Sequence, residues 1–144
     1  MKDPQQLDGI LSDILASHAG REGALLPILH DVQAAYGHVS EHAVRVIAKS
    51  LNLTRAEVHG VVSFYHDFRE SPEPRPVLKL CRAESCQARG VEAMVAALPG
   101  NSRVAVETVY CLGLCSVGPA AMVGRTVYGR LDATRLGALV ESLA

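Results

Sequence analysis

Aromatic residues are scarce in this sequence of 144 residues, and neither a basic excess nor a long apolar run is present. Tryptophan is absent and only 4% of the residues are aromatic, which leaves little material for stacking nucleic-acid bases. Acidic side chains slightly outnumber basic ones, 15 to 14, whereas nucleic-acid-binding proteins usually carry a basic excess. No apolar stretch is long enough to cross a bilayer. We therefore expect no nucleic-acid partner and no direct membrane insertion.

Several functional motifs are missing as well. The first ten residues, MKDPQQLDGI, lack the basic-then-apolar layout of a secretory signal, so we expect a cytoplasmic protein. The sequence has no P-loop, no glycine-rich dinucleotide motif after a strand and no nucleophile–base pattern. We therefore assign no catalytic residue and expect no turnover from the isolated chain. His38 and His42 are four residues apart, but without a third ligand this spacing is typical of surface residues.

Residues 1–70 have the pattern of a small helical bundle. Proline is tolerated in a first helical turn, so Asp3 and Pro4 predict a helix start. Gly37 is suited to the left-handed position that ends a helix, and Thr54 with Glu57 matches a capping box. Short connections between helices favour a bundle. Apolar residues recur at helical spacing in four segments, near residues 7–15, 25–36, 44–51 and 58–62.

A proline-rich connector at residues 71–76 separates this bundle from a second domain at 77–144. Pro72, Pro74 and Pro76 alternate along it, which excludes a helix and favours extended chain. Beyond it the pattern predicts the order β-α-β-β-β-α, with a hairpin turn at Gly124 and Arg125. The strands are expected near 77–81, 103–109, 120–123 and 126–129, and the helices near 91–98 and 132–143. The fold class is therefore α+β, a helical bundle followed by a compact α/β domain.

The chain has four cysteines, grouped as C-x4-C and C-x3-C: Cys81 with Cys86, and Cys111 with Cys115. Each pair is expected in a loop beside the end of a strand. If those two strands are parallel neighbours, both loops emerge at one edge of the sheet, where α/β proteins commonly bind ligands. Clustered cytoplasmic thiols are more often metal-binding or redox-active than joined in structural disulfides. We therefore expect the four thiols to share one site.

Four chemistries compete for these thiols. Structural zinc sites usually use closer C-x2-C pairs, and thioredoxin-type redox centres need C-x-x-C, which neither pair supplies. An iron–sulfur cluster tolerates wider spacing, because each iron takes two thiolates and the irons are separated. Cysteines can also be unrelated buried hydrophobes. The spacing favours a cluster, with a zinc-binding assembly module and thiol redox chemistry as the alternatives.

Residues near the cysteines are compatible with a cluster. Gly113 and Gly118 allow the backbone to approach and point N–H groups at sulfur, which stabilises a reduced cluster. Pro119 begins a predicted strand, where a trans peptide bond is the ordinary case and a cis bond is the alternative. Three arginines, Arg82, Arg89 and Arg125, are either counter-charges to a negative cluster or ordinary surface side chains.

Three stretches, GVVSFYHDF, VLKLCRAESC and VYCLGLCSVGPAAMVGRTVYGRL, resemble a known family. They are similar to the thioredoxin-like [2Fe-2S] ferredoxin subunit of NADH dehydrogenase (respiratory complex I) and its relatives in NAD-reducing hydrogenases and NAD-dependent formate dehydrogenases. The resemblance covers nearly the whole chain and implies a thioredoxin-like fold for residues 77–144. It also implies that the N-terminal helices dock on a partner flavoprotein, which binds FMN and NAD(H). The ligands that it implies for one [2Fe-2S] cluster are Cys81, Cys86, Cys111 and Cys115.

Within the family, two features look most like the gamma subunit of a soluble NAD-dependent formate dehydrogenase. One is the loop CRAESCQARG, and the other is the short insert PGNSRVAVETVY before the second cysteine pair, with a chain that ends directly after its last helix. The expected function is single-electron exchange with the partner's FMN in a formate dehydrogenase assembly. The equivalent subunit of NADH:quinone oxidoreductase or of an NAD-reducing hydrogenase is the alternative.

Overall fold

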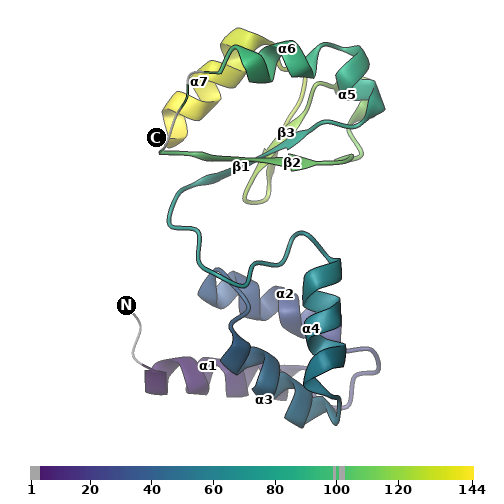
Figure 1. Cartoon of the computed structure of the whole chain (residues 1–144), viewed down its shortest axis with the longest axis vertical. Coiled ribbons are helices and arrows are strands. Elements are labelled where there is room, and N and C mark those ends of the chain that lie inside the picture. The colour runs from purple at the N-terminus through teal and green to yellow at the C-terminus, as the bar shows by residue number, and fades with distance from the viewer. Residues whose placement is uncertain (1–3, 99, 101–102) are drawn as a thin grey trace. The chain divides into compact units, whose positions relative to one another are not determined.

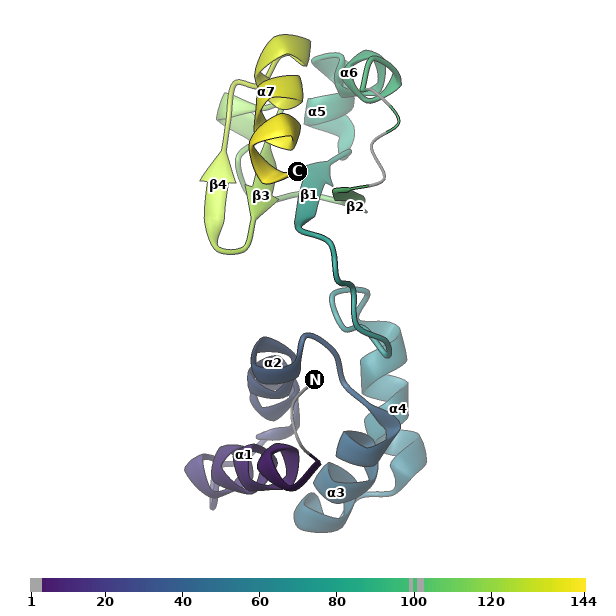
Figure 2. The same ribbon diagram turned by 90° about the vertical axis from the view of Figure 1, so that its left-hand side faces the viewer.

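The structure is a computed structural model that describes residues 4–98, 100 and 103–144. The chain divides into two compact units, with the boundary between Glu73 and Pro74 (Figures 1 and 2). Asp3, the predicted start of the first helix, lies outside the described residues. Within the described residues, helices form the first unit, and a mixed sheet with helices forms the second. The fold class is therefore the predicted one, with a helical part followed by an α/β part.

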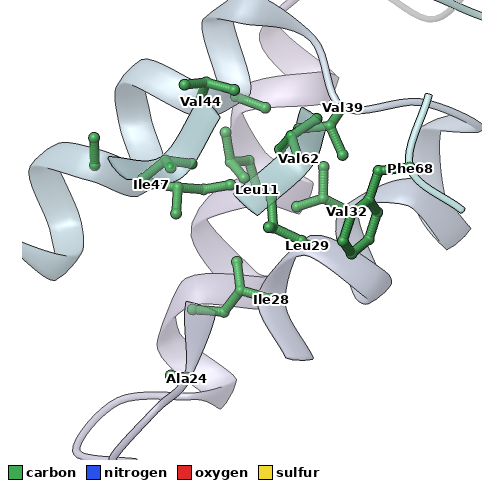
Figure 3. Close-up of a cluster of buried hydrophobic side chains, with 13 residues drawn as sticks. Leu11, Ala24, Ile28, Leu29, Val32, Val39, Val44, Ile47, Val62 and Phe68 are labelled. Carbon is green, nitrogen blue, oxygen red and sulfur yellow. The ribbon is translucent and has the colours of Figure 1, made fainter. Parts of the chain in front are cut away.

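Four helices build the first unit around an aliphatic core. They are α1 (Pro4–Ser17), α2 (Leu25–Tyr36), α3 (Glu41–Leu51) and α4 (Arg55–Phe64). Their apolar faces converge on side chains such as Ile28, Leu29 and Ile47, which are fully buried. Figure 3 shows this cluster, with Phe68 closing one end of it. The helical spacing of apolar residues therefore predicted the elements of this unit correctly.

Local capping signals define where these helices begin and end. The Thr54 hydroxyl accepts a hydrogen bond from the Glu57 backbone N–H, while the Glu57 carboxylate accepts from the Thr54 backbone N–H at 2.7 Å. The predicted capping box is therefore confirmed. Gly37 has φ of 79°, as predicted for the left-handed end of α2. Ser40 caps α3 by accepting from the Ala43 N–H.

The second unit is a four-stranded sheet in the order β2-β1-β3-β4. Its strands are β1 (Val77–Cys81), β2 (Ala105–Val109), β3 (Ala121–Val123) and β4 (Thr126–Tyr128). The first two strands are parallel, with Val77 level with Ala105 and Cys81 level with Val109. The other pairings are antiparallel, and β3 and β4 form the predicted hairpin around Gly124 and Arg125.

Three helices lie together on one side of this sheet, as Figure 1 shows. They are α5 (Glu84–Ala88), α6 (Val91–Ala96) and α7 (Ala133–Leu143). The core beneath them combines strand residues Leu78 and Leu80 with Leu136 and Val140 of α7. Asp132 accepts a hydrogen bond from the Arg135 N–H and so caps α7 at its expected start. The sheet and its helices therefore form a core separate from that of the helical unit.

The structure corrects two expectations at the cysteines. Cys86 lies inside the short helix α5, where the sequence pattern predicts a loop, whereas Cys81 is the last residue of β1, as predicted. The peptide bond between Gly118 and Pro119 is cis, so the ordinary trans assignment is wrong. None of the helices in the described ranges is long and apolar enough to span a bilayer.

Candidate functional site

The two cysteine segments leave the sheet side by side. Cys81 ends β1 and lies level with Val109 of β2, two residues before Cys111. The Arg82 N–H donates to the Val109 carbonyl at 2.9 Å, so the two strands remain joined just where the cysteine segments begin. The strands β1 and β2 are parallel neighbours, so the condition set from the sequence is met and both segments emerge at the same edge of the sheet.

The second segment turns sharply to present its thiols. Cys111 has φ of 85°, a backbone conformation that few residues other than glycine adopt. Gly113 also has a positive φ, and a short 3₁₀ helix, η1 (Cys115–Val117), follows. These turns leave Cys111 and Cys115 exposed, with their sulfur atoms 3.8 Å apart.

The first pair is buried, which makes the site asymmetric. Only 3% of Cys81 and 2% of Cys86 are exposed, and both side chains belong to the core of the α/β unit. The four thiols are free, with no disulfide among them. The site therefore has an inner pair embedded in the core and an outer pair open to the surroundings.

Hydrogen bonds to Cys81 favour its charged form. Burial raises the pKa of the Cys81 thiol, but donors around the sulfur oppose this and the pKa lies below its ordinary value. A thiolate that accepts several hydrogen bonds is stabilised relative to the thiol. The donors are the Cys86 thiol and the backbone N–H groups of Ala83, Cys111 and Leu112. The backbone N–H of Cys111, in the second cysteine segment, thus helps to stabilise negative charge on the Cys81 sulfur in the first segment.

The partner thiol in each pair shows the opposite tendency. Burial raises the pKa of Cys86, and the hydrogen bond to Cys81 raises it further. The pKa of Cys115 is raised by its hydrogen bond with Cys111 and by the charge of that neighbour. Cys115 also responds to the charge of Cys81, which is on the other pair. The two pairs are therefore close enough to interact electrostatically.

Glycines bring the backbone against sulfur, as predicted. The Gly113 N–H donates to the Cys111 Sγ at 3.3 Å. A Cβ atom at Gly118 would lie only 3.1 Å from the Cys86 Sγ, so a side chain there would crowd the inner pair. At Gly129 a Cβ atom would lie 2.9 Å from the carbonyl oxygen of Val117, inside the second cysteine segment. The segment is therefore packed closely against its neighbours on two sides.

The grouping of the thiols fits a two-iron cluster. Within the described ranges, no three or more histidine, cysteine or acidic side chains gather as a single metal ion requires. The thiols instead form two pairs at one sheet edge. A [2Fe-2S] cluster needs this grouping, since each iron takes two thiolates. Backbone N–H groups already directed at Cys81 and Cys111 would stabilise the negative charge of such a cluster.

Sequence reasoning overlooked some contributors to this site. The N–H donors of Ala83 and Ala120 were not identified, because backbone donors leave no side-chain signature. Ser85 was also missed, and its hydroxyl donates to the Cys115 carbonyl at 3.2 Å. The one sequence feature that could have identified Ser85 is its position directly before Cys86 in a short polar stretch.

Arg82, a candidate counter-charge, forms an ion pair away from the thiols. Its Nε lies 2.8 Å from a carboxylate oxygen of Glu92, so its charge is paired there.

The histidines belong to the helical unit. All six lie in the helical unit, and three of them pair with carboxylates. His42, one half of the H-x-x-x-H spacing, pairs with Asp8 at 2.8 Å, while His38 contacts the Tyr36 carbonyl. That spacing therefore belongs to surface contacts of the bundle.

Comparisons with known proteins point to one family. The family described as "Thioredoxin-like [2Fe-2S] ferredoxin" matches residues 11–144. The "NADH-quinone oxidoreductase subunit 2" of Thermus thermophilus is 31% identical over 136 residues, which cover 86% of this chain and 75% of that protein. The "NADP-reducing hydrogenase subunit HndA" of Solidesulfovibrio fructosivorans is 28% identical, covering 89% of this chain and 81% of that protein.

A solved structure shares the fold. A chain of an NAD⁺-reducing [NiFe]-hydrogenase, in its H2-reduced state, aligns with a TM-score of 0.67 and 27% identity. The alignment covers 83% of this chain and only 22% of that longer hydrogenase chain. The thioredoxin-like fold that the sequence resemblance implied is thereby confirmed. The chain belongs to the thioredoxin-like [2Fe-2S] ferredoxin family.

Proposed function

We propose that this member of the thioredoxin-like [2Fe-2S] ferredoxin family is the electron-transfer subunit of an NAD-dependent oxidoreductase. It exchanges single electrons with the FMN of a partner flavoprotein that binds NAD(H). The observation that carries the proposal is the grouping of the four cysteines. They form two pairs of thiols at the sheet edge where β1 and β2 end, and backbone N–H groups are directed at the sulfurs of Cys81 and Cys111. Substrate turnover belongs to the partner subunits.

The proposed ligands are Cys81, Cys86, Cys111 and Cys115. When bound, a [2Fe-2S] cluster accepts and releases one electron at a time. The residues of this chain bind it, direct N–H groups at it and limit its contact with water. Leu112, Leu114 and Val117 are candidates for limiting that contact, since all three are partly buried within the second segment.

The difference in exposure between the two thiol pairs suggests through which side of the site electrons enter and leave. Cys81 and Cys86 are enclosed by the core, whereas Cys111 and Cys115 are exposed. The side that carries the outer pair is therefore the side that a redox partner reaches over the shortest distance. Tyr110, 77% exposed and next to Cys111, lies at the rim of this surface.

The helical unit is the proposed docking part for the flavoprotein. Phe64 and Tyr65, at the end of α4, are 73% and 44% exposed and stack edge to face. Exposed aromatic side chains are frequent anchors of protein interfaces, since they bury a large area with few rotatable bonds. An aromatic pair at the surface of a bundle with a complete core of its own favours an interface role.

Formate dehydrogenase is the assembly that we infer for this subunit. The inference rests on the loop CRAESCQARG and on the short insert PGNSRVAVETVY before the second cysteine pair. The proposed flow runs from formate through other centres to the flavin and on to NAD⁺. The equivalent subunits of NADH:quinone oxidoreductases and of hydrogenases are the competing assignments.

Iron and acid-labile sulfide analysis of the anaerobically purified full chain tests the cluster. We expect two iron and two sulfide per chain, since a [2Fe-2S] cluster contains these atoms. Stoichiometric zinc without sulfide would instead identify a structural zinc module and refute the proposal. Rapid reaction with a disulfide substrate that survives loss of Cys81 would support a thiol oxidoreductase.

Gentle, low-salt purification of the chain from its host tests the assembly. We expect an FMN-containing NAD(H)-oxidising subunit to copurify, together with a formate-oxidising subunit. A hydrogenase or a quinone-reducing assembly in its place would overturn the formate dehydrogenase assignment and leave the electron-transfer role. Absence of any flavoprotein would contradict the role itself.

A matched pair of variants tests the docking surface. The double variant Phe64→Ala with Tyr65→Ala should weaken flavoprotein binding at least tenfold, because interface anchors of this type often contribute more than about 2 kcal/mol. Val127→Ala is the control, since Val127 is an exposed apolar residue (51%) on the other unit. Equal retention of the flavoprotein by both variants would rule out this docking surface.

A further inference from the structure

Two side chains at α5 hold the second cysteine segment by its backbone. The Ser85 hydroxyl donates to the carbonyl oxygen of Cys115 at 3.2 Å. The Nη1 of Arg89, the C-cap residue directly after α5, donates to the carbonyl oxygens of Ser116 at 3.3 Å and Gly118 at 3.0 Å. Ser85 and Arg89 are four residues apart, with Cys86 between them. The helix α5 and its cap therefore both carry a thiol of the inner pair and hydrogen-bond to the second cysteine segment.

The carbonyl oxygens of residues 115–118 are all engaged. Besides the three held from α5, the Val117 carbonyl accepts from the Arg130 N–H at 2.5 Å. A carbonyl oxygen carries the negative end of the peptide dipole and would repel thiolates if it faced them. These contacts direct the oxygens to two side chains and to a backbone N–H shortly after β4, which keeps the oxygens from turning toward the sulfurs.

The stem of Arg89 also lies near Gly118, whose backbone comes close to the Cys86 sulfur. A Cβ atom at Gly118 would lie 3.1 Å from the Cys86 Sγ and 3.8 Å from the Cδ of Arg89. The Cys86 thiol and the arginine stem therefore lie on the same face of Gly118, the face that a side chain would occupy.

We propose that Arg89 is a positioning residue for the iron–sulfur cluster. Its guanidinium fixes the backbone of residues 116–118 against Cys86, and this sets the position of Cys115 relative to the inner pair. Its positive charge also lies on the segment that would surround a negatively charged cluster. The inference rests on the proposed function, because it takes the four cysteines as the ligands. Arg82 differs in that its charge is paired with Glu92.

Variants of the full chain test this role. Arg89→Gln removes the charge and the forked guanidinium group, whereas Arg89→Lys keeps the charge alone. Arg125→Gln is the control with the same loss of charge, because Arg125 is exposed at the β3–β4 turn. The antiparallel pairing of β1 with β3 places this turn at the end of the sheet away from Cys81, so Arg125 is an ordinary surface side chain. Loss of a residue that orients metal ligands typically weakens a site tenfold or more. We expect the visible absorption of Arg89→Gln to bleach about tenfold faster in excess chelator, and Arg125→Gln to match the wild type.

The reduction potential separates positioning from general stability. In Arg89→Gln we expect a lower potential, because the reduced cluster is more negative and loses a nearby positive charge. Arg89→Lys should restore the potential and leave the faster bleaching, since lysine supplies charge without the two-carbonyl geometry. If Arg89→Gln matches Arg125→Gln in both bleaching rate and potential, the proposal is wrong.

A measurement on the cluster-free chain keeps this inference distinct from the proposed function. Amide hydrogen exchange of residues 115–118 and of Arg130 should be faster in Arg89→Gln than in Arg125→Gln, because the segment loses two of its contacts. Unchanged exchange would refute the positioning role even if the cluster forms. A wild-type chain without iron and sulfide would refute the proposed function, and exchange would still decide whether Arg89 holds the segment.

Discussion

The two units of this chain differ in charge and in what completes their cores. Residues 1–73 contain ten acidic and six basic side chains, a net of −4, whereas residues 74–144 contain five acidic and eight basic ones, a net of +3. All the histidines lie in the first unit and all the cysteines in the second. The bundle core is aliphatic with one phenylalanine, while the α/β core includes Cys81 and Cys86.

The presence of cysteines in only one of the two cores shows how a binding site can be built into the core of one unit and left out of the other. The bundle is complete by packing alone, so its surface is free to serve an interface. The α/β unit places two proposed ligands among its buried apolar side chains, so ligand binding and packing depend on the same residues. Changes to one unit should therefore have different consequences from changes to the other.

The largest expected effect is at the cysteines, and it separates the inner pair from the outer pair. Both Cys86→Ser and Cys115→Ser should abolish or rearrange the visible and EPR spectra of the cluster. In the cluster-free chain, Cys86→Ser should also destabilise the α/β unit by about 1–3 kcal/mol, because it places a hydroxyl in an apolar core. Cys115 is exposed, so its variant should change stability by less than about 0.5 kcal/mol.

Denaturant unfolding of the cluster-free variants, followed by circular dichroism, measures this contrast. Equal destabilisation by the two substitutions would show that burial of Cys86 in the core does not contribute to the stability of the α/β unit. A native cluster spectrum in either variant would remove that cysteine from the ligand set.

Core truncation should come next in size and should stay within one unit. Ile47→Ala empties part of the bundle core and should cost about 2–5 kcal/mol of unfolding free energy. The bundle should then unfold at lower denaturant, while the visible spectrum of the cluster persists. Leu80→Ala, in the other core, should have the reverse pattern. Coupled loss of both signals in both variants would show that the units do not fold separately.

The smallest expected effect is a pH dependence confined to the bundle. The Thr54 backbone N–H and hydroxyl lower the pKa of Glu57 below its ordinary value of 4.5. A lowered folded-state pKa stabilises the fold above about pH 4.5, and this contribution disappears as the pH falls through the folded value. The difference in Tm between wild type and Glu57→Ala should thus shrink between about pH 7 and about pH 3.

Glu22→Ala, an exposed carboxylate of the same unit, is the control for that comparison. Its Tm difference from the wild type should change little over the same range. A constant difference for Glu57→Ala would mean that its carboxylate contributes nothing through the capping box.

Local signals explain how much of this fold was predictable. Thr54 with Glu57, Gly37, Asp132 and the Gly124 turn each act over a few residues, so sequence alone located the elements that they bound. The four cysteines were likewise visible as two pairs. The parallel pairing of β1 and β2 entered only as a condition, since it depends on contacts between distant segments.

Features that depend on tertiary packing were not predictable in the same way. The helix α5 has only five residues and no side-chain cap, so its periodicity was too short to detect. The burial of Cys86 but not of Cys115 is decided by where the core lies relative to each segment. The contacts of Arg89 join residues that are 27 and 29 positions apart, so the sequence showed the arginine without its partners.

Gly129 has a consequence for reading natural variants of this chain. It lies well beyond the last cysteine in sequence, so a survey of substitutions ranked by sequence distance from the cysteines would score it as harmless. Yet any side chain there would collide with the Val117 carbonyl, and the turn that begins at Cys115 would have to move. An inherited change from glycine to alanine at this position is thus expected to behave as a defect of the redox centre.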